Sequence, residues 1–394
     1  MLVDDAGMPL HFANRYAYSM IEKSGKSLSS IKQALFVISR LYLWAELRGV
    51  DLERLLFFGD HLNLDQVSDI IDFIQFTSIT QKGILIAKQE SVAENIINRS
   101  DIISFKNSAK ISYKYTSIQV YANRLRSLKK FLKWVIVERI AQRIKTTAKI
   151  IEASKLALDR IENSIPRINT RLDDEKLEAI DLDVIERIAK ILHPEHTQNP
   201  FSTYFIRHRN YLLLLLLIES GGRRQEIYHT KSKDIIAGTL QYDIKISKTK
   251  PRTLPVSRML VDSFETYHHK YWRNLSGKGR KAGYLFVKSN GERMSLRAVN
   301  YVIETIRKEI PEVPPWFHTH TIRRTFNHRL SLLIDKKRDE GYIISHEEER
   351  KMRNRMNGWS GNSRMGEIYN ARHLREKADR LAELALNSIW KMTG

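Results

Sequence analysis

The positive charge of this chain falls into two separate blocks, and this distribution constrains its domain organisation. Lys and Arg exceed Asp and Glu by 10 in residues 101–150 and by 12 in residues 201–300, whereas residues 151–200 carry a net charge of −4. The whole chain has 394 residues and a formal net charge of +21. Two basic blocks flanking an acidic stretch indicate two domains that face one polyanion, rather than one basic tail. Solvated lysines on ordinary surface helices are the alternative.

The composition excludes several classes of protein. A hydrophobic content of 42% with 9 Pro and 17 Gly excludes collagen-like and fully disordered chains. The chain has no Cys, which excludes disulfides and thiolate metal sites. Its longest apolar run, Tyr211–Ile218, is far shorter than the roughly 20 residues of a membrane span and predicts a buried helix. The N-terminus lacks a secretory signal pattern, so we expect a cytoplasmic protein without a membrane partner.

The N-terminal part shows helical periodicity. Apolar residues recur at helical spacing over residues 29–49 and 116–139. The second stretch is also basic, and its candidate DNA-binding residues are Arg124, Arg126, Lys129, Lys130 and Lys133. A calmodulin-target or membrane-surface helix looks similar, but neither explains the second basic block. We predict a helical N-terminal domain over 1–163 that binds DNA phosphates, within which the net acidic residues 1–100 could form a separate segment for protein contacts.

The C-terminal part begins after a linker predicted at 164–180, where Pro166 and an acidic cluster lie. Residues 242–247 and 252–257 have β character and are separated by a basic turn, which predicts a hairpin. Ser295 is a candidate N-cap for the next helix, and residues 370–390 show an apolar helical stripe. The predicted fold class is therefore mainly α with a small antiparallel β-sheet (α+β), the second domain spanning 181–394.

Two pairs of residues with catalytic chemistry lie about a hundred residues apart. Arg223 precedes Glu226 by three positions, so on a helix the carboxylate can orient the guanidinium. His320 and Arg323 have the same spacing. Two bidentate donors and an imidazole that converge suit a phosphate whose charge grows in a transition state. Lys248 on the hairpin turn could donate a proton, and Tyr369 supplies a phenolic oxygen further along the chain.

The order of these motifs is more specific than any one of them. The series Gly-Gly-Arg-x-x-Glu, hairpin Lys, His-x-x-Arg-x-Thr-Phe, Gly-Trp and Tyr resembles the catalytic constellation of the tyrosine recombinase (phage integrase) family over about residues 175–394. The segments Leu254-Pro255-Val256 and Tyr284-Leu285-Phe286 are also similar to that family. The N-terminal domain resembles the family's helical core-binding domain only in position and composition.

The resemblance implies a role for each matching residue. Tyr369 would attack a scissile phosphodiester and form a 3′-phosphotyrosyl link, without ATP, metal or other cofactor. Arg223 and Arg323 would hold the non-bridging oxygens, Lys248 would protonate the leaving 5′ oxygen, and His320 would manage the phenolic proton. The implied catalytic residues are Arg223, Lys248, His320, Arg323, Trp359 and Tyr369, with Glu226 in support. Further candidate DNA contacts are Lys250, Arg252 and Arg324, and Lys250 competes with Lys248 for the acid role.

The chain departs from the family pattern in three places. Trp359 stands where many members have His, and an indole N–H can bond a phosphate oxygen but cannot transfer a proton. Tyr369 follows Trp359 by ten residues, one more than expected, and the other nearby tyrosine, Tyr342, is out of order. Residues 335–355 are charged at 13 of 21 positions, which predicts a solvated helical insertion.

The sequence offers no convincing metal site. His318 and His320, or His193 and His196, could be ligands, but neither pair has a third and fourth ligand at useful spacing. The expected function is site-specific DNA recombination for a prokaryotic mobile element, by a homo-oligomer with a dimer on each site and a tetrameric synapse, with accessory proteins possible. A housekeeping resolvase, a type IB-like topoisomerase and a catalytically silent DNA-binding regulator remain alternatives.

Overall fold

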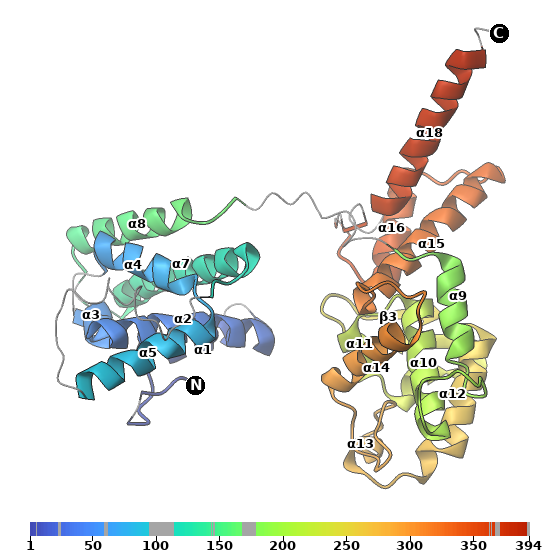
Figure 1. Ribbon diagram of the computed structural model, residues 1–394, viewed down its shortest axis with the longest axis horizontal. Helices are drawn as coiled ribbons and strands as arrows, with labels where there is room; N and C mark the ends of the chain where they lie inside the picture. The colour runs from blue at the N-terminus through green and yellow to red at the C-terminus, as the bar shows by residue number, and fades with distance from the viewer. Residues whose placement is uncertain are drawn as a thin grey trace. The chain divides into compact units, whose positions relative to one another are not determined.

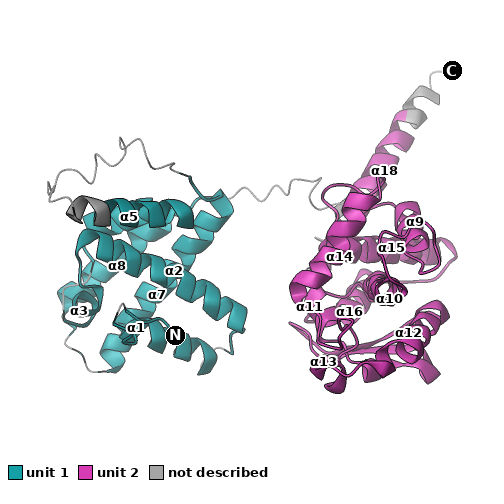
Figure 2. Ribbon diagram, turned by 60° about the horizontal axis from the view of Figure 1, so that its bottom comes forward, with its two compact units in different colours: residues 1–170 teal, residues 171–394 magenta. Residues whose placement is uncertain are grey.

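Helices account for most of the described chain (Figure 1). The structure is a computed structural model that describes residues 1–4, 6–22, 25–58, 62–93, 114–142, 144, 146–167, 179–361, 363, 365–366 and 371–391. The chain divides into two compact units, residues 1–170 and 171–394 (Figure 2).

The described part of the first unit is helical. Its helices are α1 (His11–Glu22), α2 (Leu28–Arg48), α3 (Leu52–Phe58), α4 (Leu64–Ile74), α5 (Ser78–Ala93), α7 (Ile118–Ala141) and α8 (Ala148–Asn163). The ends of α2 follow from its sequence: Ser27 accepts a hydrogen bond from the backbone N–H of Ser30, and Gly49 ends the helix in the left-handed conformation, with φ 64°. Trp44 of α2 and Phe131 of α7 are buried in the core of this unit.

Two arginines of the basic helix α7 point into the protein. Nη1 of Arg124 donates to the carbonyl oxygens of Ile74 and Phe76, both at 2.7 Å. Nη1 of Arg139 donates to the carbonyl oxygen of Leu56, also at 2.7 Å. Because each bond reaches another part of the unit, these two guanidinium groups tie α7 to the ends of α3 and α4.

The second unit combines helices with a small sheet. Its α-helices are α9 (Leu182–Ile191), α10 (Tyr204–Ser220), α11 (Arg224–His229), α12 (Arg258–Lys270), α13 (Lys278–Lys281), α14 (Leu296–Glu309), α15 (Thr319–Asp339), α16 (His346–Asn357) and α18 (Ala371–Lys391). Short 3-10 helices are η3 (Ser232–Asp234), η4 (Ala237–Thr239) and η5 (Trp272–Asn274). Ser295 caps α14, as predicted, by accepting from the backbone N–H of Ala298.

The sheet within the described residues has three antiparallel strands in the order β1–β2–β3. They are β1 (Ile235–Ile236), β2 (Gln241–Ile244) and β3 (Arg252–Pro255), with Tyr242 of β2 opposite Leu254 of β3. The predicted hairpin is β2–β3. Strand β1 has only two residues, too few for an alternating pattern, and was not predicted. The predicted fold class, mainly helical with a small antiparallel sheet, is confirmed.

Helix α10 lies at the centre of the second unit. Its residues 212–217 are all leucines and at most 1% exposed, and α10 packs against α12 and α15. The apolar run is thus a buried core helix, as predicted. No helix in the described part of the chain is long and apolar enough to cross a lipid bilayer.

The charged segment 335–355 covers the end of α15 and most of α16. It is helical but not wholly solvated. Arg353 is 3% exposed and donates to Glu349 on its own helix and, at 2.9 Å, to the hydroxyl of Ser331 on α15. Helix α16 therefore packs on α15 through a buried polar face.

Candidate active site

The turn that carries Arg223 depends on two glycines. Gly221 ends α10 with φ +54°, and a Cβ there would lie 2.5 Å from the ring of Phe326 on α15. Gly222 follows, and Arg223 is the N-cap residue of α11. Close packing against α15 and a left-handed backbone both require glycine at position 221. The turn therefore fixes Arg223 beside the helix that carries His320 and Arg323.

Glu226 is the centre of a buried ion-pair network. Its carboxylate accepts from Nη1 of Arg223 at 2.9 Å, from Nη2 of Arg252 at 2.8 Å and from the hydroxyl of Ser247 at 2.7 Å. Burial by itself would raise the pKa of Glu226, but the bonds and charge of Arg252 and the contacts with Arg223 and Ser247 lower it to about 2. Glu226 is therefore ionised, and the network keeps a net positive charge.

Arg323 is almost fully buried at the junction of three segments. Its Nη1 donates to the carbonyl oxygen of Gly221 at 2.5 Å and its Nη2 to that of Asn357 at 2.9 Å. Its guanidinium also lies 5.4 Å from the centre of the Trp359 ring. Both acceptors are neutral carbonyls, so neither cancels the charge of Arg323.

The turn between β2 and β3 is docked onto Gly358. The backbone N–H of Lys250 donates to the carbonyl oxygen of Gly358 at 3.3 Å, and the hydroxyl of Thr249 donates to the same oxygen. Gly358 has φ +67°, and a Cβ there would lie 2.9 Å from the carbonyl oxygen of Lys250. The turn, on which Lys248 is exposed, is thus held next to Trp359.

His320 lies in the first turn of α15 in a positively charged environment. Its surroundings lower its pKa, first through partial desolvation and then through the charges of His318, Arg324, Arg323 and Arg223. The imidazole of His320 is therefore neutral near pH 7, although it retains contact with solvent. A neutral imidazole can accept a proton, and two of the three arginines that influence it, Arg223 and Arg323, belong to the connected group of the candidate site.

His318 has a structural role at the start of the same helix. It is the N-cap residue of α15, and its Nδ1 accepts from the backbone N–H of Thr321 at 3.2 Å and contacts the hydroxyl of Thr321 at 2.5 Å. Nδ1 is thus committed to the helix terminus.

The second unit therefore brings together one connected group of residues: Arg223, Glu226, Arg323 and Trp359. His320 lies close enough for the charges of Arg223 and Arg323 to lower its pKa. Lys248 and Lys250 are exposed on the docked turn, and Arg324 is half-buried. Tyr369 lies outside the described residues.

Arg252 and Arg124, both predicted as DNA contacts, occupy interior positions. They are 9% and 7% exposed. Arg252 bonds Glu226, and Arg124 bonds backbone carbonyls. Their place in the structure favours a supporting role. The helical pattern could not separate Arg124 from its exposed neighbours, because a long arginine can reach inward from the edge of an apolar face. Arg252 lies on the predicted hairpin, and its partner Glu226 is 26 positions away in the sequence.

The remaining predicted contacts of the first unit lie on the surface of α7. Arg126, Lys130 and Lys133 are exposed, whereas Lys129 is half-buried and pairs with Glu162 of α8 at 3.0 Å. Three of these four basic side chains are thus open to an anionic ligand.

Three residues of the site were missed by sequence reasoning. Ser247 and Thr249 flank Lys248, and their hydroxyls bond Glu226 and Gly358. Asn357 supplies a carbonyl oxygen to Arg323, and its side-chain amide exchanges hydrogen bonds with that of Asn327. The hydroxyls on either side of Lys248 were a usable signal. The contact between Arg323 and Asn357 could not be predicted, because it uses the backbone carbonyl, which every residue has.

Comparisons with known proteins agree on the kind of domain. Residues 178–332 match the model of the phage integrase family. The structure of the Tn1549 transposon integrase in complex with transposon right end DNA is 15% identical, with a TM-score of 0.51, over 94% of this chain and 99% of that chain. This similarity shows a shared fold.

Two further solved structures are similar at lower scores. The XerH site-specific recombinase bound to difH substrate is 15% identical over 94% of this chain and 93% of that chain, with a TM-score of 0.47. XerA recombinase is 14% identical over 94% and 97%, with a TM-score of 0.39. No curated protein matches the sequence significantly.

Proposed function

Because residues 178–332 belong to the phage integrase family, we propose that this chain is a site-specific tyrosine recombinase that cuts and rejoins DNA. The observation that carries the proposal is the connected group of Arg223, Glu226, Arg323 and Trp359, with neutral His320 beside it. Glu226 orients Arg223, and two carbonyl oxygens orient Arg323. A guanidinium held in place before the ligand arrives stabilises developing phosphate charge without reorganising.

The proposed reaction is a transfer of the phosphoryl group to tyrosine. The phenolic oxygen of Tyr369 forms a bond to phosphorus as the bond from phosphorus to the 5′ oxygen breaks. His320 accepts the phenolic proton, and Lys248 donates a proton to the leaving oxygen. Because the phosphotyrosyl bond conserves the energy of the phosphodiester, the 5′ hydroxyl of another strand can reverse the step without ATP.

The proposed setting is the integration or excision of a mobile element in a prokaryotic cytoplasm. The partner is double-stranded DNA with specific sites, on which the protein assembles as a dimer per site and a tetramer in the synapse. The complex of the similar Tn1549 transposon integrase with transposon right end DNA supports the DNA partner.

A nicked suicide substrate tests this function. Duplexes from the repeats that flank the gene, nicked next to the cleavage point, should lose a short fragment and leave the protein covalently attached to the 3′ phosphate. The reaction should need neither ATP nor magnesium. Sequence-specific binding of the same duplexes without any covalent capture would instead identify a DNA-binding regulator.

The exposed basic face of α7 is the proposed phosphate-binding surface of the first unit. Replacing Lys129, Lys130 and Lys133 together by Gln should weaken binding to all DNA sequences and lower the slope of log K against log salt by up to about 0.9 per lost contact, with the exposed Lys130 and Lys133 contributing more than Lys129, which is paired with Glu162. Mobility-shift titrations at several salt concentrations measure that slope.

A control variant with the same loss of charge distinguishes local contacts from general attraction. Lys32, Lys149 and Lys155 are exposed lysines on α2 and α8, and replacing them together by Gln should change the slope less. Equal slopes for the two variants would contradict a phosphate site on α7.

The C-terminal helix supports the proposed assembly. In the views of Figures 1 and 2, α18 extends away from the rest of the second unit. Its Leu374, Leu381 and Leu384 are 55%, 61% and 59% exposed. An apolar stripe on a surface helix is stabilised when a second surface covers it, and we propose that a neighbouring protomer on DNA does so.

Replacing Leu381 and Leu384 by Ser should therefore preserve binding to a single site and eliminate the slower band of paired-site complexes in a mobility-shift titration. Leu333 of α15 is 52% exposed and off this stripe, so its replacement by Ser is the matched control. Unchanged assembly by the double variant would show that the stripe is not an interface.

A further inference from the structure

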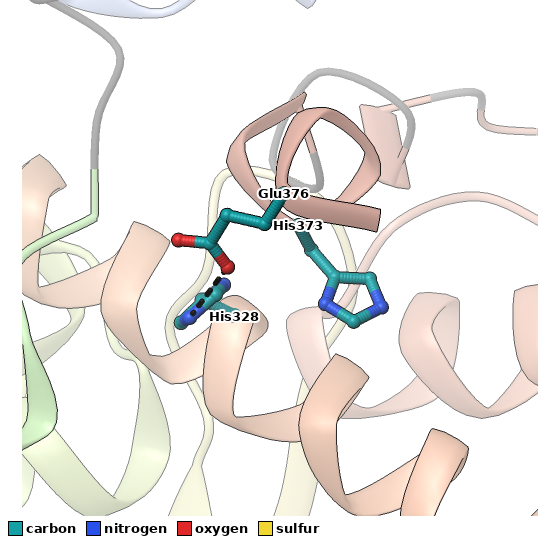
Figure 3. Close-up of side chains that lie close together, drawn as sticks. All are labelled: His328, His373 and Glu376. Carbon is teal, nitrogen blue, oxygen red and sulfur yellow. Dashed lines mark ion pairs between the residues drawn. The ribbon is translucent and has the colours of Figure 1, made fainter. Parts of the chain in front are cut away.

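Two histidines and a glutamate from two helices of the second unit meet near the start of α18. His328 belongs to α15, whereas His373 and Glu376 lie three positions apart on α18 (Figure 3). One nitrogen or oxygen ligand atom from each lies within 4.8 Å of the others. Among the described residues, no other group of three such side chains brings its ligand atoms this close.

We propose that these three side chains form a binding site for a zinc-class divalent ion that fastens α18 to α15. Two imidazoles and one carboxylate, with a fourth position left for water, are a set of ligands typical of zinc. The chain has no Cys, so nitrogen and oxygen atoms are its available strong ligands for such an ion.

The geometry requires only small movements. Nε2 of His328 lies 3.8 Å from Oε2 of Glu376. Bonds of about 2 Å in a tetrahedral site separate neighbouring ligand atoms by roughly 3.3 Å. Rotation of exposed Glu376 about its side-chain bonds can close this difference. Rotation of the imidazole rings can shorten the other separations between ligand atoms, which are at most 4.8 Å.

Asp335 holds His373 in the orientation that a ligand needs. Nε2 of His373 lies 2.9 Å from Oδ2 of Asp335, and Nδ1 faces His328 and Glu376 (Figure 3). A carboxylate that accepts a hydrogen bond from the non-ligating ring nitrogen of a histidine fixes the tautomer and raises the basicity of the ligating nitrogen. Lys377 also contacts Oδ2 of Asp335, at 3.0 Å, so the acid pairs with a cation of α18 as well as with His373.

Burial and access are both suitable. The side chains of His328 and His373 are 7% and 12% exposed, whereas that of Glu376 is 44% exposed. A cavity of about 550 Å³, lined in part by Asp335, His346 and His373, adjoins the site. Ligands fixed on one side and an open approach on the other allow an ion to enter and keep a bound water.

The ion would be structural, and no step of strand transfer passes through it. It would anchor α18 just four positions after Tyr369 in the sequence. Zinc binding at this site does not depend on whether the chain cleaves DNA, so its test uses no DNA.

The test is a calorimetric titration of the full chain, stripped of metal, with Zn²⁺ alone. The wild-type protein should bind one equivalent of Zn²⁺, and His373→Asn or Glu376→Gln should each weaken the affinity at least tenfold. The thermal unfolding midpoint of the wild-type protein should rise when zinc is added. Asp335→Asn should weaken binding by about 10–100-fold without removing a ligand. Both ligand substitutions lie on the outer helix and leave buried His328 intact, so the variants should fold.

His346→Gln is the matched control, because His346 lines the neighbouring cavity outside the cluster. It should bind zinc like wild type, and Co²⁺ should give visible absorption bands in wild type that His373→Asn lacks. Equal zinc uptake by wild type and the His373→Asn/Glu376→Gln double variant would overturn the proposal and leave only ion pairs between the helices.

Discussion

Tyr369→Phe is expected to abolish covalent capture on a nicked DNA substrate while leaving DNA binding intact. The substitution removes only the phenolic oxygen, which is the proposed nucleophile, and a phenyl ring cannot form a phosphoester. Trapped complex should therefore fall below detection on denaturing gels, whereas mobility shifts should match wild type. No neighbouring hydroxyl is expected to substitute, because attack requires alignment opposite the leaving 5′ oxygen.

Tyr342→Phe is the matched control. Tyr342 precedes Gly358 in the sequence, is 60% exposed, and has the ammonium of Lys337 4.8 Å from the centre of its ring. Its variant should capture DNA at the wild-type level. If Tyr369→Phe still captures DNA, peptide mapping of the covalent adduct identifies the tyrosine responsible.

Glu226→Gln is expected to destabilise the second unit by about 3–5 kcal/mol, because it leaves buried positive charge without its partner. Arg252 has a side-chain exposure of 4% and Glu226 of 0%, so solvent cannot replace the lost carboxylate. Glutamine retains the shape of the side chain. The loss therefore reports charge rather than packing, and denaturant unfolding at pH 7 measures it.

The effect of this substitution should depend on pH in a defined direction. The folded-state pKa of Glu226 is about 2, below its ordinary value of 4.5. Its ionised form therefore contributes its full stability above about pH 4.5, and that contribution is lost as the pH falls toward 2. The difference in unfolding free energy between wild type and variant should shrink over this interval.

Glu312→Gln supplies the comparison. Glu312 pairs with Arg187 on the surface, where both side chains are more than two-fifths exposed. Its replacement should leave stability at pH 7 nearly unchanged. A loss for Glu226→Gln as small as that for Glu312→Gln would show that the network around Glu226 is not needed to hold the site together.

Much of the local structure was determined by short stretches of sequence. Ser295 begins α14 and the leucines 212–217 form a buried helix, both as predicted, and Gly49 ends α2 at the end of the periodic stretch 29–49. Caps, helical periodicity and turn residues act over a few positions, so they are visible in sequence. The order of the motifs from Arg223 to Trp359 was equally visible, because the order of residues along the chain can be compared with a family pattern without any structure.

Tertiary structure decided which charged groups face outward. Arg124 and Arg252 belong to the basic blocks by sequence, yet both bond acceptors inside the protein. A guanidinium has a flexible stem, so its direction depends on acceptors contributed by distant segments. Arg252 is far from Glu226 in the sequence, and Arg124 is far from Ile74. A pattern that spans only a few residues therefore cannot reveal these partners.

The same physical reason applies to the histidine cluster and to the hairpin turn. His328 and His373 are 45 positions apart in the sequence, and they become neighbours only because α18 returns to α15. Thr249 and Lys250 meet Gly358 because its left-handed backbone, without a Cβ, leaves room for the turn. The sequence alone determined the helices, the hairpin and the kinds of chemistry available, whereas long-range packing decided which of those groups meet, since burial and ion pairing depend on distance in space.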